Sequence, residues 1–360
     1  MSRLVRTFIL IMLALVIIIN LSTDDIYAQK PKVRIAWSIY VGWMPWDYAD
    51  AQGILKSWGD RYGVEIELLP RMDYIASIEA YVAKQVDACV MTNMEALDMP
   101  AASGITSTAL IIGDYSNGND AVLTRDNINI DNIKGHEVYL AELSVSHYLL
   151  DRYLKSKGLS ERDVKLMNTS DSDIAPIFIG NKDIKVVVTW NPMVMEIMKT
   201  PGVTNVYNSS KTPGEILDLM VISTDLLEKN PDIGRALVGA WYEVMDIMSK
   251  RGSATDEALE YMGAEAEASL VEYKNQLKTT MMFWTSQSAA DYAKSKEIKE
   301  KMDYVRNFCF DHGLLGENAP SVDIVGIKYP DGTIQGNSRN VQFTFDAKFM
   351  QEHADGKIKK

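Results

Sequence analysis

The sequence contains little cysteine and little histidine, with 2 Cys and 4 His among 360 residues. Cys89 and Cys309 sit in apolar surroundings, which favours two buried thiols, although a disulfide between them stays open. The histidines are scattered along the chain, at His136, His147, His312 and His353. None of them stands at a close ligand spacing from cysteine or carboxylate residues, so the sequence does not support a zinc site. We expect neither a metal nor a cofactor.

Catalytic sequence motifs and an excess of positive charge are missing as well. No Gly-x-Ser-x-Gly, His-Glu-x-x-His or Walker-type run occurs, and we therefore expect a protein that is not an enzyme. Lys and Arg number 37 against 49 Asp and Glu, which gives a formal net charge of -12. An acidic protein of this kind repels phosphate backbones, and this argues against nucleic-acid binding.

Long apolar runs are absent except for one at the N-terminus. Arg3 and Arg6 precede an apolar run over residues 8–19, and a polar stretch then leads to Ala28. This order is typical of a secretory signal peptide, and the run is short for a bilayer span of ~20 residues. We expect cleavage near Gln29 and a periplasmic mature protein, with an uncleaved membrane anchor as the alternative. No cysteine near the break offers an attachment atom for a lipid.

From Lys32 onward, short β-branched runs alternate with helical patterns. The predicted strands of the first half are Val33–Trp37, Val64–Leu69, Asp87–Met91 and Ser107–Ile112. The predicted helices between them are Pro45–Trp58, one from Asp73 to Ala83, and one capped by Asn93. Alternation of this kind predicts α/β architecture, with parallel-rich sheets and crossover helices.

A second α/β unit follows the polar turn over 114–120. Its predicted strands are Val138–Leu140, Val164–Met167, Ile184–Val188 and Val203–Tyr207, with Leu217–Ser223 after them. Its predicted helices are Val145–Lys157, Asp173–Ile179 and Pro192–Met198. An amphipathic helix is predicted over Pro231–Ser249, and the rest is mainly helical until the pattern fades at Asp323.

These units predict a bilobal clamshell with a helical C-terminal part. We assign residues 1–28 to the signal peptide, 29–120 and 220–322 to lobe I, 121–219 to lobe II, and 323–360 to a C-terminal extension. The two crossings, near residues 120 and 220, would form a hinge, and a ligand would bind between the lobes. We expect a monomer.

Several motifs resemble, in order, those of the nitrate/sulfonate/taurine class of ABC substrate-binding proteins. They are the Gly42-Trp43-Met44-Pro45 turn, the Ala51-Gln52-Gly53-Ile54 helix end, and the run from Asp131 to Met167 with its Ile-Lys-Gly turn. The resemblance covers roughly residues 32 to 250 and implies type II periplasmic-binding-protein topology. It also implies a small-molecule ligand, and a permease and an ATPase as partners.

Within that class the chain looks most like the branch associated with urea carboxylase gene regions. The supporting residues are Trp37, Trp43 and Trp46, the Thr92–Ala96 run (TNMEA), and the Thr189–Pro192 run (TWNP). This resemblance implies urea or guanidinium as the ligand. Another ligand of the class (nitrate, a sulfonate or a pyrimidine precursor) is the alternative.

Polar and aromatic residues follow the predicted strands, at the edge where α/β sheets bind ligands. The candidate ligand-binding residues are Trp37, Tyr40, Trp43, Trp46, Asn93, Glu95, Glu142, Asp173, Trp190, Asn191 and Asp218. Asp114, Asp120 and Asp171 also follow strands. No Lys or Arg occupies these positions, whereas an anion receptor would present basic groups or helix N-termini. Aromatic faces and carboxylates instead suit a planar cation.

Each candidate also has a structural interpretation. A Trp near a strand end can be core, Asp73, Asn93 and Asp173 can cap helices, and Glu95 can favour a helix dipole. Asp218 lies among apolar neighbours, where an unpaired carboxylate is costly, so it needs a partner. Two other functions remain open, namely a pyrimidine-precursor synthase of the same fold and a sensor that contacts a signalling ectodomain.

Overall fold

The computed structural model describes residues 30–360. The predicted signal peptide, 1–28, lies outside the described residues. Lys32–Lys360 form one compact unit. Across residues 30–360, no helix has both the length and the apolar character that crossing a membrane would require.

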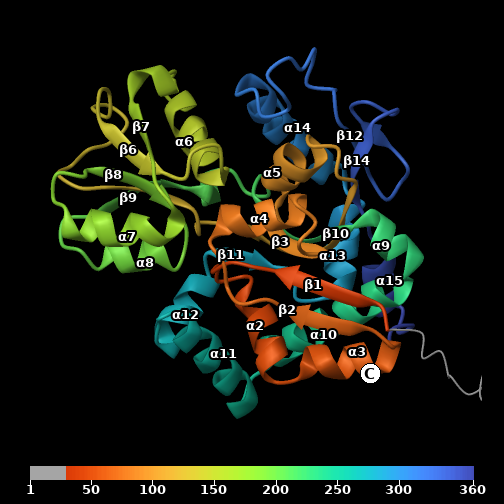
Figure 1. The fold of residues 1–360 in the computed structure, drawn as a ribbon. Helices are drawn as coiled ribbons and strands as arrows, with labels where there is room; N and C mark the ends of the chain where they lie inside the picture. Colours follow the sequence, from red (N-terminus) through yellow and green to blue (C-terminus); the bar gives the residue numbers. More distant parts are fainter. Residues whose placement is uncertain (1–29) are drawn as a thin grey trace, which may run out of the picture. The chain divides into compact units, whose positions relative to one another are not determined.

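Nine strands form the first sheet, in the order β13-β12-β14-β4-β10-β3-β1-β2 with β11 paired to β4 (Figure 1). Their bounds are β1 (Lys32–Ala36), β2 (Glu65–Leu68), β3 (Ala88–Thr92), β4 (Ser107–Ser116), β10 (Leu217–Ser223), β11 (Thr280–Met282), β12 (Gly326–Lys328), β13 (Ile334–Gln335) and β14 (Val341–Phe345). β3 is buried at every position and β10 at all but its last, as expected of central strands covered on both faces.

Five strands form the second sheet, in the order β7-β6-β8-β5-β9. Their bounds are β5 (Ala121–Thr124), β6 (Glu137–Leu140), β7 (Lys165–Asn168), β8 (Val186–Thr189) and β9 (Thr204–Asn208). β5 was not predicted from the sequence. This strand is short and follows directly after a polar turn, so its four residues show too little pattern to stand out.

Both sheets are mixed, although the strand–helix alternation predicted parallel-rich ones. β1 lies parallel to β2 and β3, and β6 lies parallel to β7 and β8. β10, however, lies antiparallel to β3 and β4, and β5 lies antiparallel to β8 and β9. These two strands are the first after each passage between the sheets, and there the chain enters the new sheet in the opposite direction.

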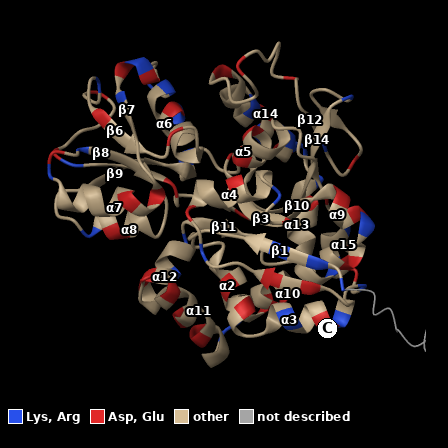
Figure 2. Ribbon diagram, viewed as in Figure 1, with Lys and Arg blue, Asp and Glu red and all other residues tan. Residues whose placement is uncertain are grey.

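Helices cover both sheets (Figure 1). Those of the first are α2 (Met44–Ala51), α3 (Ile54–Tyr62), α4 (Tyr74–Val82), α5 (Asn93–Ala96), η1 (Leu97–Ala101), α9 (Thr224–Lys229), α10 (Pro231–Ser249), α11 (Ser253–Glu265), α12 (Leu270–Leu277), α13 (Ser286–Ala293), α14 (Lys296–Asp311) and α15 (Lys348–Ala354). Those of the second are α6 (Val145–Lys155), η2 (Glu161–Asp163), α7 (Asp171–Gly180) and α8 (Met193–Met198), with η3 (Ser209–Lys211) after β9. Acidic side chains are spread over many of them, and α11 carries no basic residue (Figure 2).

Two predictions about helix ends were wrong. The predicted helix Pro45–Trp58 is two helices, because Gly53 adopts a left-handed conformation with φ +69° between α2 and α3. The predicted cap at Asn93 belongs instead to Thr92, whose side chain accepts a hydrogen bond from the Met94 N–H. The side chain of Asn93 is thereby free for a long-range contact.

The two passages between the sheets lie against each other. Residues 117–120 connect β4 to β5, and residues 209–216 connect β9 back to β10. The Ser209 Oγ atom lies 2.6 Å from the Ser116 Oγ atom and accepts a hydrogen bond from the Gly118 N–H at 2.7 Å. Such paired crossings are the usual site of a hinge between lobes.

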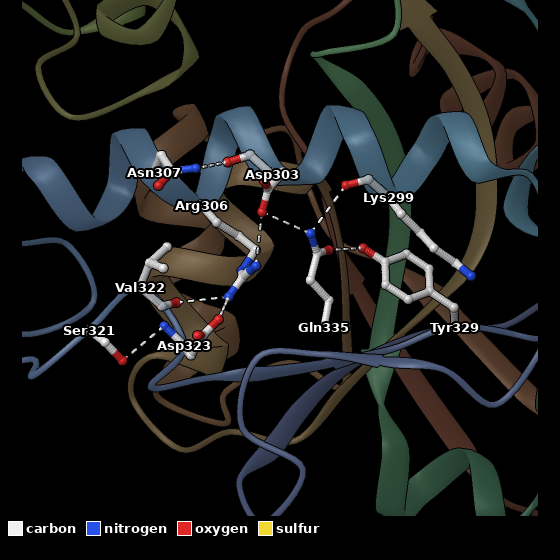
Figure 3. A network of polar contacts seen from close by, with 9 residues as sticks. All are labelled: Lys299, Asp303, Arg306, Asn307, Ser321, Val322, Asp323, Tyr329 and Gln335. Carbon is white, nitrogen blue, oxygen red and sulfur yellow. Dashed lines mark hydrogen bonds and ion pairs between the residues drawn. The ribbon is translucent and has the colours of Figure 1, made fainter.

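The segment 323–360 adds three strands and a helix to the first sheet. β14 pairs in parallel with β4, in the run Val341–Phe345 where the sequence alternates. Arg306 of α14 lies in a polar network that binds the segment, because its guanidinium contacts Asp323 and donates to the Val322 carbonyl (Figure 3). Arg306 is almost fully buried, so this network anchors the C-terminal part to α14.

Candidate ligand-binding site

A small cavity lies where residues of the two sheets meet. Its volume is about 20 Å³, and we call it the central cavity. It is lined by Tyr40, Trp43, Tyr74, Thr92, Asp120, Val145, Trp190, Ile216 and Asp218. No Lys or Arg is among these residues. A cavity of this volume holds about one water molecule, so only a ligand of few atoms suits it, and the walls must move apart slightly to admit one.

Two carboxyl groups stand opposite each other on neighbouring strands, and one of them, Asp218, lines this cavity. Asp218 of β10 stands directly opposite Asp114 of β4 in the antiparallel register. Both residues are buried, and the Oδ2 atom of each lacks a donor from any other described residue, although a hydrogen bond between the two carboxyl groups contributes to the pKa of each. The Tyr40 hydroxyl donates to the other oxygen of Asp114 at 2.7 Å. Like charges in opposed positions destabilise a sheet, so this pair needs a proton or a bound cation.

The electrostatics of the acidic residues follow from their burial. Burial raises the pKa of Asp114 to about 7 and that of Asp120 to about 6. Burial also raises the pKa of Asp218 well above its usual range, and the negative charge of Asp114 raises it further. Below these pKa values the groups hold protons that a cation would displace.

Glu95 is fully buried beside the central cavity and is saturated with donors. Its carboxylate accepts hydrogen bonds from the Tyr74 hydroxyl at 2.8 Å and from the Thr92 hydroxyl. It also accepts from the Val145 N–H at 3.0 Å, at the first residue of α6. Glu95 therefore connects the first sheet to the N-terminus of a second-sheet helix, where the helix dipole favours a negative charge.

Four aromatic rings surround the central cavity. The Tyr74 ring lies 5.5 Å from the Trp43 ring and 5.7 Å from the Trp190 ring between centroids, and Tyr40 lies 4.9 Å from Trp43. The indole N–H of Trp190 donates to the Ile39 carbonyl at 3.2 Å, while that of Trp43 has no partner among the described residues. Aromatic faces next to carboxylates suit a flat cation.

Four of the predicted site residues are occupied by contacts elsewhere. The Trp37 indole N–H donates to the Leu69 carbonyl at 2.9 Å, and Trp46 stacks on Trp241 at 5.0 Å. Asn93 donates to the Glu215 carbonyl and accepts from the Leu217 N–H, so it fixes the start of β10. Asn191 donates to the Thr279 hydroxyl at 3.1 Å. None of these four side chains lines the central cavity.

Two further predicted residues lie away from the central cavity. Glu142 lines a larger cavity of about 410 Å³, which we call the outer cavity; Asp73, Tyr74, Asp98, Asp171 and Trp190 line it too. Asp173 is exposed and accepts a hydrogen bond from the Ser170 hydroxyl at 2.9 Å. The buried acid of this helix start is Asp171, two residues earlier, because the first turn of α7 directs it towards Asp73.

The candidate set left out Tyr74, Thr92 and Asp120, whose polar or aromatic side chains line the central cavity, and Asp114 opposite Asp218. Asp114 and Asp120 could be found, because they follow a predicted strand as acidic residues. Tyr74 had no such signal, since the first residue of a helix is an ordinary place for an aromatic side chain. Gly42 was also missed: a Cβ there would lie 2.4 Å from the Asp114 Oδ2 atom, so glycine lets the chain pass close to this carboxyl.

Three residues that are far apart in the sequence gather beside α6. The Glu161 Oε1 atom lies 2.9 Å from His147 Nε2 and 2.7 Å from His312 Nε2. Although burial alone would raise it, the hydrogen bonds from these histidines lower the pKa of Glu161 to about 2. His147 Nδ1 accepts the Leu143 N–H at 3.1 Å, so its ring proton is on Nε2. That atom has no lone pair for a metal, and the ring is neutral, so the cluster fits an ion pair between Glu161 and His312 with a neutral His147 beside it.

The two predicted cysteine thiols are both buried and unpaired. The Cys89 Sγ atom lies 3.6 Å from the Ser77 hydroxyl, and burial raises the pKa of this thiol to about 12. A thiol of this kind is an inert core group rather than a nucleophile or a ligand.

Comparison with known proteins gives a family and a fold. The family described as NMT1/THI5 like matches residues 54–251, more than half of the chain. No curated protein matches the sequence. Three similar solved structures are the aliphatic sulphonate binding protein SsuA of Escherichia coli, a putative sulfonate-binding SsuA of Methylobacillus flagellatus, and the nitrate-binding protein NrtA of Synechocystis.

These likenesses extend over most of each chain at low sequence identity. The Escherichia coli protein is 15% identical, with a TM-score of 0.64 over 79% of this chain and 94% of that one. The Methylobacillus protein is 13% identical, with 0.66 over 91% and 95%. The Synechocystis protein is 11% identical, with 0.56 over 91% and 98%. The fold is thus the type II periplasmic-binding-protein fold, and this prediction is confirmed.

Proposed function

This chain belongs to the NMT1/THI5-like family, and we propose that it is the extracytoplasmic solute-binding component of an ABC importer. Its ligand is a small planar nitrogen compound, guanidinium or its neutral isostere urea, held between the two lobes. A permease and an ATPase would receive the ligand. One observation carries the proposal, namely that the buried carboxyl of Asp218 lines the central cavity among aromatic rings and stands opposite a second buried carboxyl, Asp114, while no Lys or Arg lines that cavity.

The charge of the cavity argues for a cation. The relatives named above are described as binding sulfonates or nitrate, which are anions. An anion needs basic groups or free helix N-termini, and no Lys or Arg lines the central cavity of this chain. The N-terminus of α6 is already taken by Glu95. The fold is therefore shared with these relatives, whereas the proposed ligand has the opposite charge.

Guanidinium suits the cavity better than urea does. Its N–H groups are all donors, and the carboxylates of Asp114 and Asp218, when ionised, offer acceptors and no donor. Its flat face matches the rings of Trp43 and Trp190, and each such contact contributes on the order of 0.5–2 kcal/mol. Urea has the same shape, but it cannot form charge-assisted bonds and it carries an oxygen that would face carboxylates.

A ligand screen tests the proposal. We expect guanidinium to raise the melting temperature of the mature protein, because a ligand that binds only the folded state stabilises it by RT ln(1 + [L]/Kd). Urea should raise it less, and nitrate and taurine should leave it unchanged. Calorimetric titration would then give each Kd. Micromolar binding of nitrate or a sulfonate without binding of guanidinium would overturn the proposed ligand and leave only the family.

Export is tested separately. Because the apolar run over 8–19 is short and ends before a small-residue break, we expect the mature chain to start near Gln29. N-terminal sequencing of the protein from a periplasmic fraction would show this start. Recovery of residues 1–28 on membrane-bound protein would instead indicate an uncleaved anchor.

A further inference from the structure

The outer cavity and the central cavity share two lining residues. Tyr74 and Trp190 line both, and their rings meet edge to face with centroids 5.7 Å apart. The outer cavity is much larger, about 410 Å³ against about 20 Å³. A ligand whose planar end lies in the central cavity would have to move this aromatic pair apart to extend into the outer one.

The charged residues of the outer cavity are all acidic. They are Asp73, Asp98, Glu142 and Asp171, and no Lys or Arg is among its lining residues. By contrast, Arg71 and Lys199 line the neighbouring cavity of about 790 Å³ together with its acidic residues. The lining of the outer cavity is thus purely acidic, whereas that of the neighbouring cavity is mixed.

Asp98 is an acidic residue of the outer cavity that is buried rather than exposed to solvent. Its side chain is only 9% exposed, and its Oδ1 atom has no hydrogen-bond partner among the described residues. Burial raises the pKa of Asp98 well above its usual range, and the negative charge of Glu95 raises it further. A buried acceptor without a donor is costly, and a bound ammonium group would remove that cost.

We propose that the outer cavity is a second cation subsite, which binds the ammonium end of an N-substituted guanidine through Asp98. This inference rests on the proposed function, because the guanidinium end occupies the central cavity. Glu142 and the Asp73–Asp171 pair lie around the same space and supply further negative charge. The ligand class is then an aminoalkyl-substituted guanidine, and free guanidinium would occupy the central cavity alone.

Paired ligands test the subsite. We would titrate ω-aminoalkylguanidines of increasing chain length, each beside the alkylguanidine of equal length that ends in a methyl group. The amino compound of optimal length should bind about tenfold to a hundredfold more tightly than its partner. Asp98→Asn should reduce this ratio to about one. Asp173→Asn is the matched control, because Asp173 is exposed and lines neither cavity, and it should keep the ratio.

The outcomes separate this inference from the proposed function. Binding of guanidinium with a ratio near one in the wild-type protein overturns the subsite alone, and so does a ratio that Asp98→Asn leaves intact. If neither guanidinium nor any substituted guanidine binds, both proposals fail. Should Asp98→Asn not fold, Glu142→Gln takes its place, since Glu142 is partly exposed and a lower ratio there supports the subsite. An unchanged ratio in that variant would count against it.

Discussion

Replacing Asp218 by asparagine is expected to weaken guanidinium binding by about 3–5 kcal/mol, which is more than a hundredfold in Kd. The Asp218 carboxyl is buried, its Oδ2 atom has no partner among the described residues other than the carboxyl of Asp114, and it is the group best placed to pair with a buried cation. Urea should lose less, because an amide oxygen still accepts a hydrogen bond from a neutral N–H. Calorimetric titration of both ligands against both proteins would measure the difference.

In the absence of ligand, the same substitution should not destabilise the protein. Asp218→Asn removes one of two opposed carboxyl groups, so the melting temperature without ligand should stay equal or rise. Asp173→Asn makes the same chemical change at an exposed position and should alter neither quantity. An equal loss of affinity for guanidinium and for urea would show that Asp218 acts through packing rather than charge.

Guanidinium affinity is expected to rise with pH through about 6 to 7, and to go on rising until Asp218, whose pKa burial also raises, is ionised. In the free protein, burial raises the pKa of Asp114 to about 7 and that of Asp120 to about 6. A cation favours the ionised carboxylates, so it must displace protons wherever the pH lies below these values. Each proton displaced makes Kd fall about tenfold per pH unit, while urea affinity should change little. Titration in buffers of different ionisation enthalpy would count the released protons.

The free energy of unfolding of the free protein should fall as pH rises, whereas guanidinium affinity rises. The pKa of Asp114 is higher in the folded protein, about 7, than the 3.8 expected when unfolded. The stability that this protonated carboxyl allows is fully present below about 3.8 and is lost as pH rises through about 7. The free energy of unfolding without ligand should therefore fall over this range, and Asp114→Asn should flatten the fall. Guanidinium affinity that does not vary with pH would contradict the displacement of protons.

The sequence predicted most elements of the fold because their local patterns were strong. β10 and α10 begin and end where they were predicted, since one is a mostly apolar run and the other is amphipathic with proline in its first turn. Elements whose local sequence pattern is weak were not predicted correctly. β5 has only four residues, and Gly53 ends α2 through its backbone conformation, which a helical pattern around it does not reveal.

For the site, the sequence by itself predicted the kind of chemistry, and the tertiary structure decided which of the candidate residues lie together. Acidic and aromatic residues without Lys or Arg at the strand ends already favoured a cation. Trp37 and Trp46 have the same residue type as Trp43, yet their partners lie elsewhere, and only folding shows this. Likewise Asp114 and Asp218 are about a hundred residues apart, and the antiparallel register of β4 and β10 makes them neighbours. Register depends on pairing across the whole chain, which no local pattern contains.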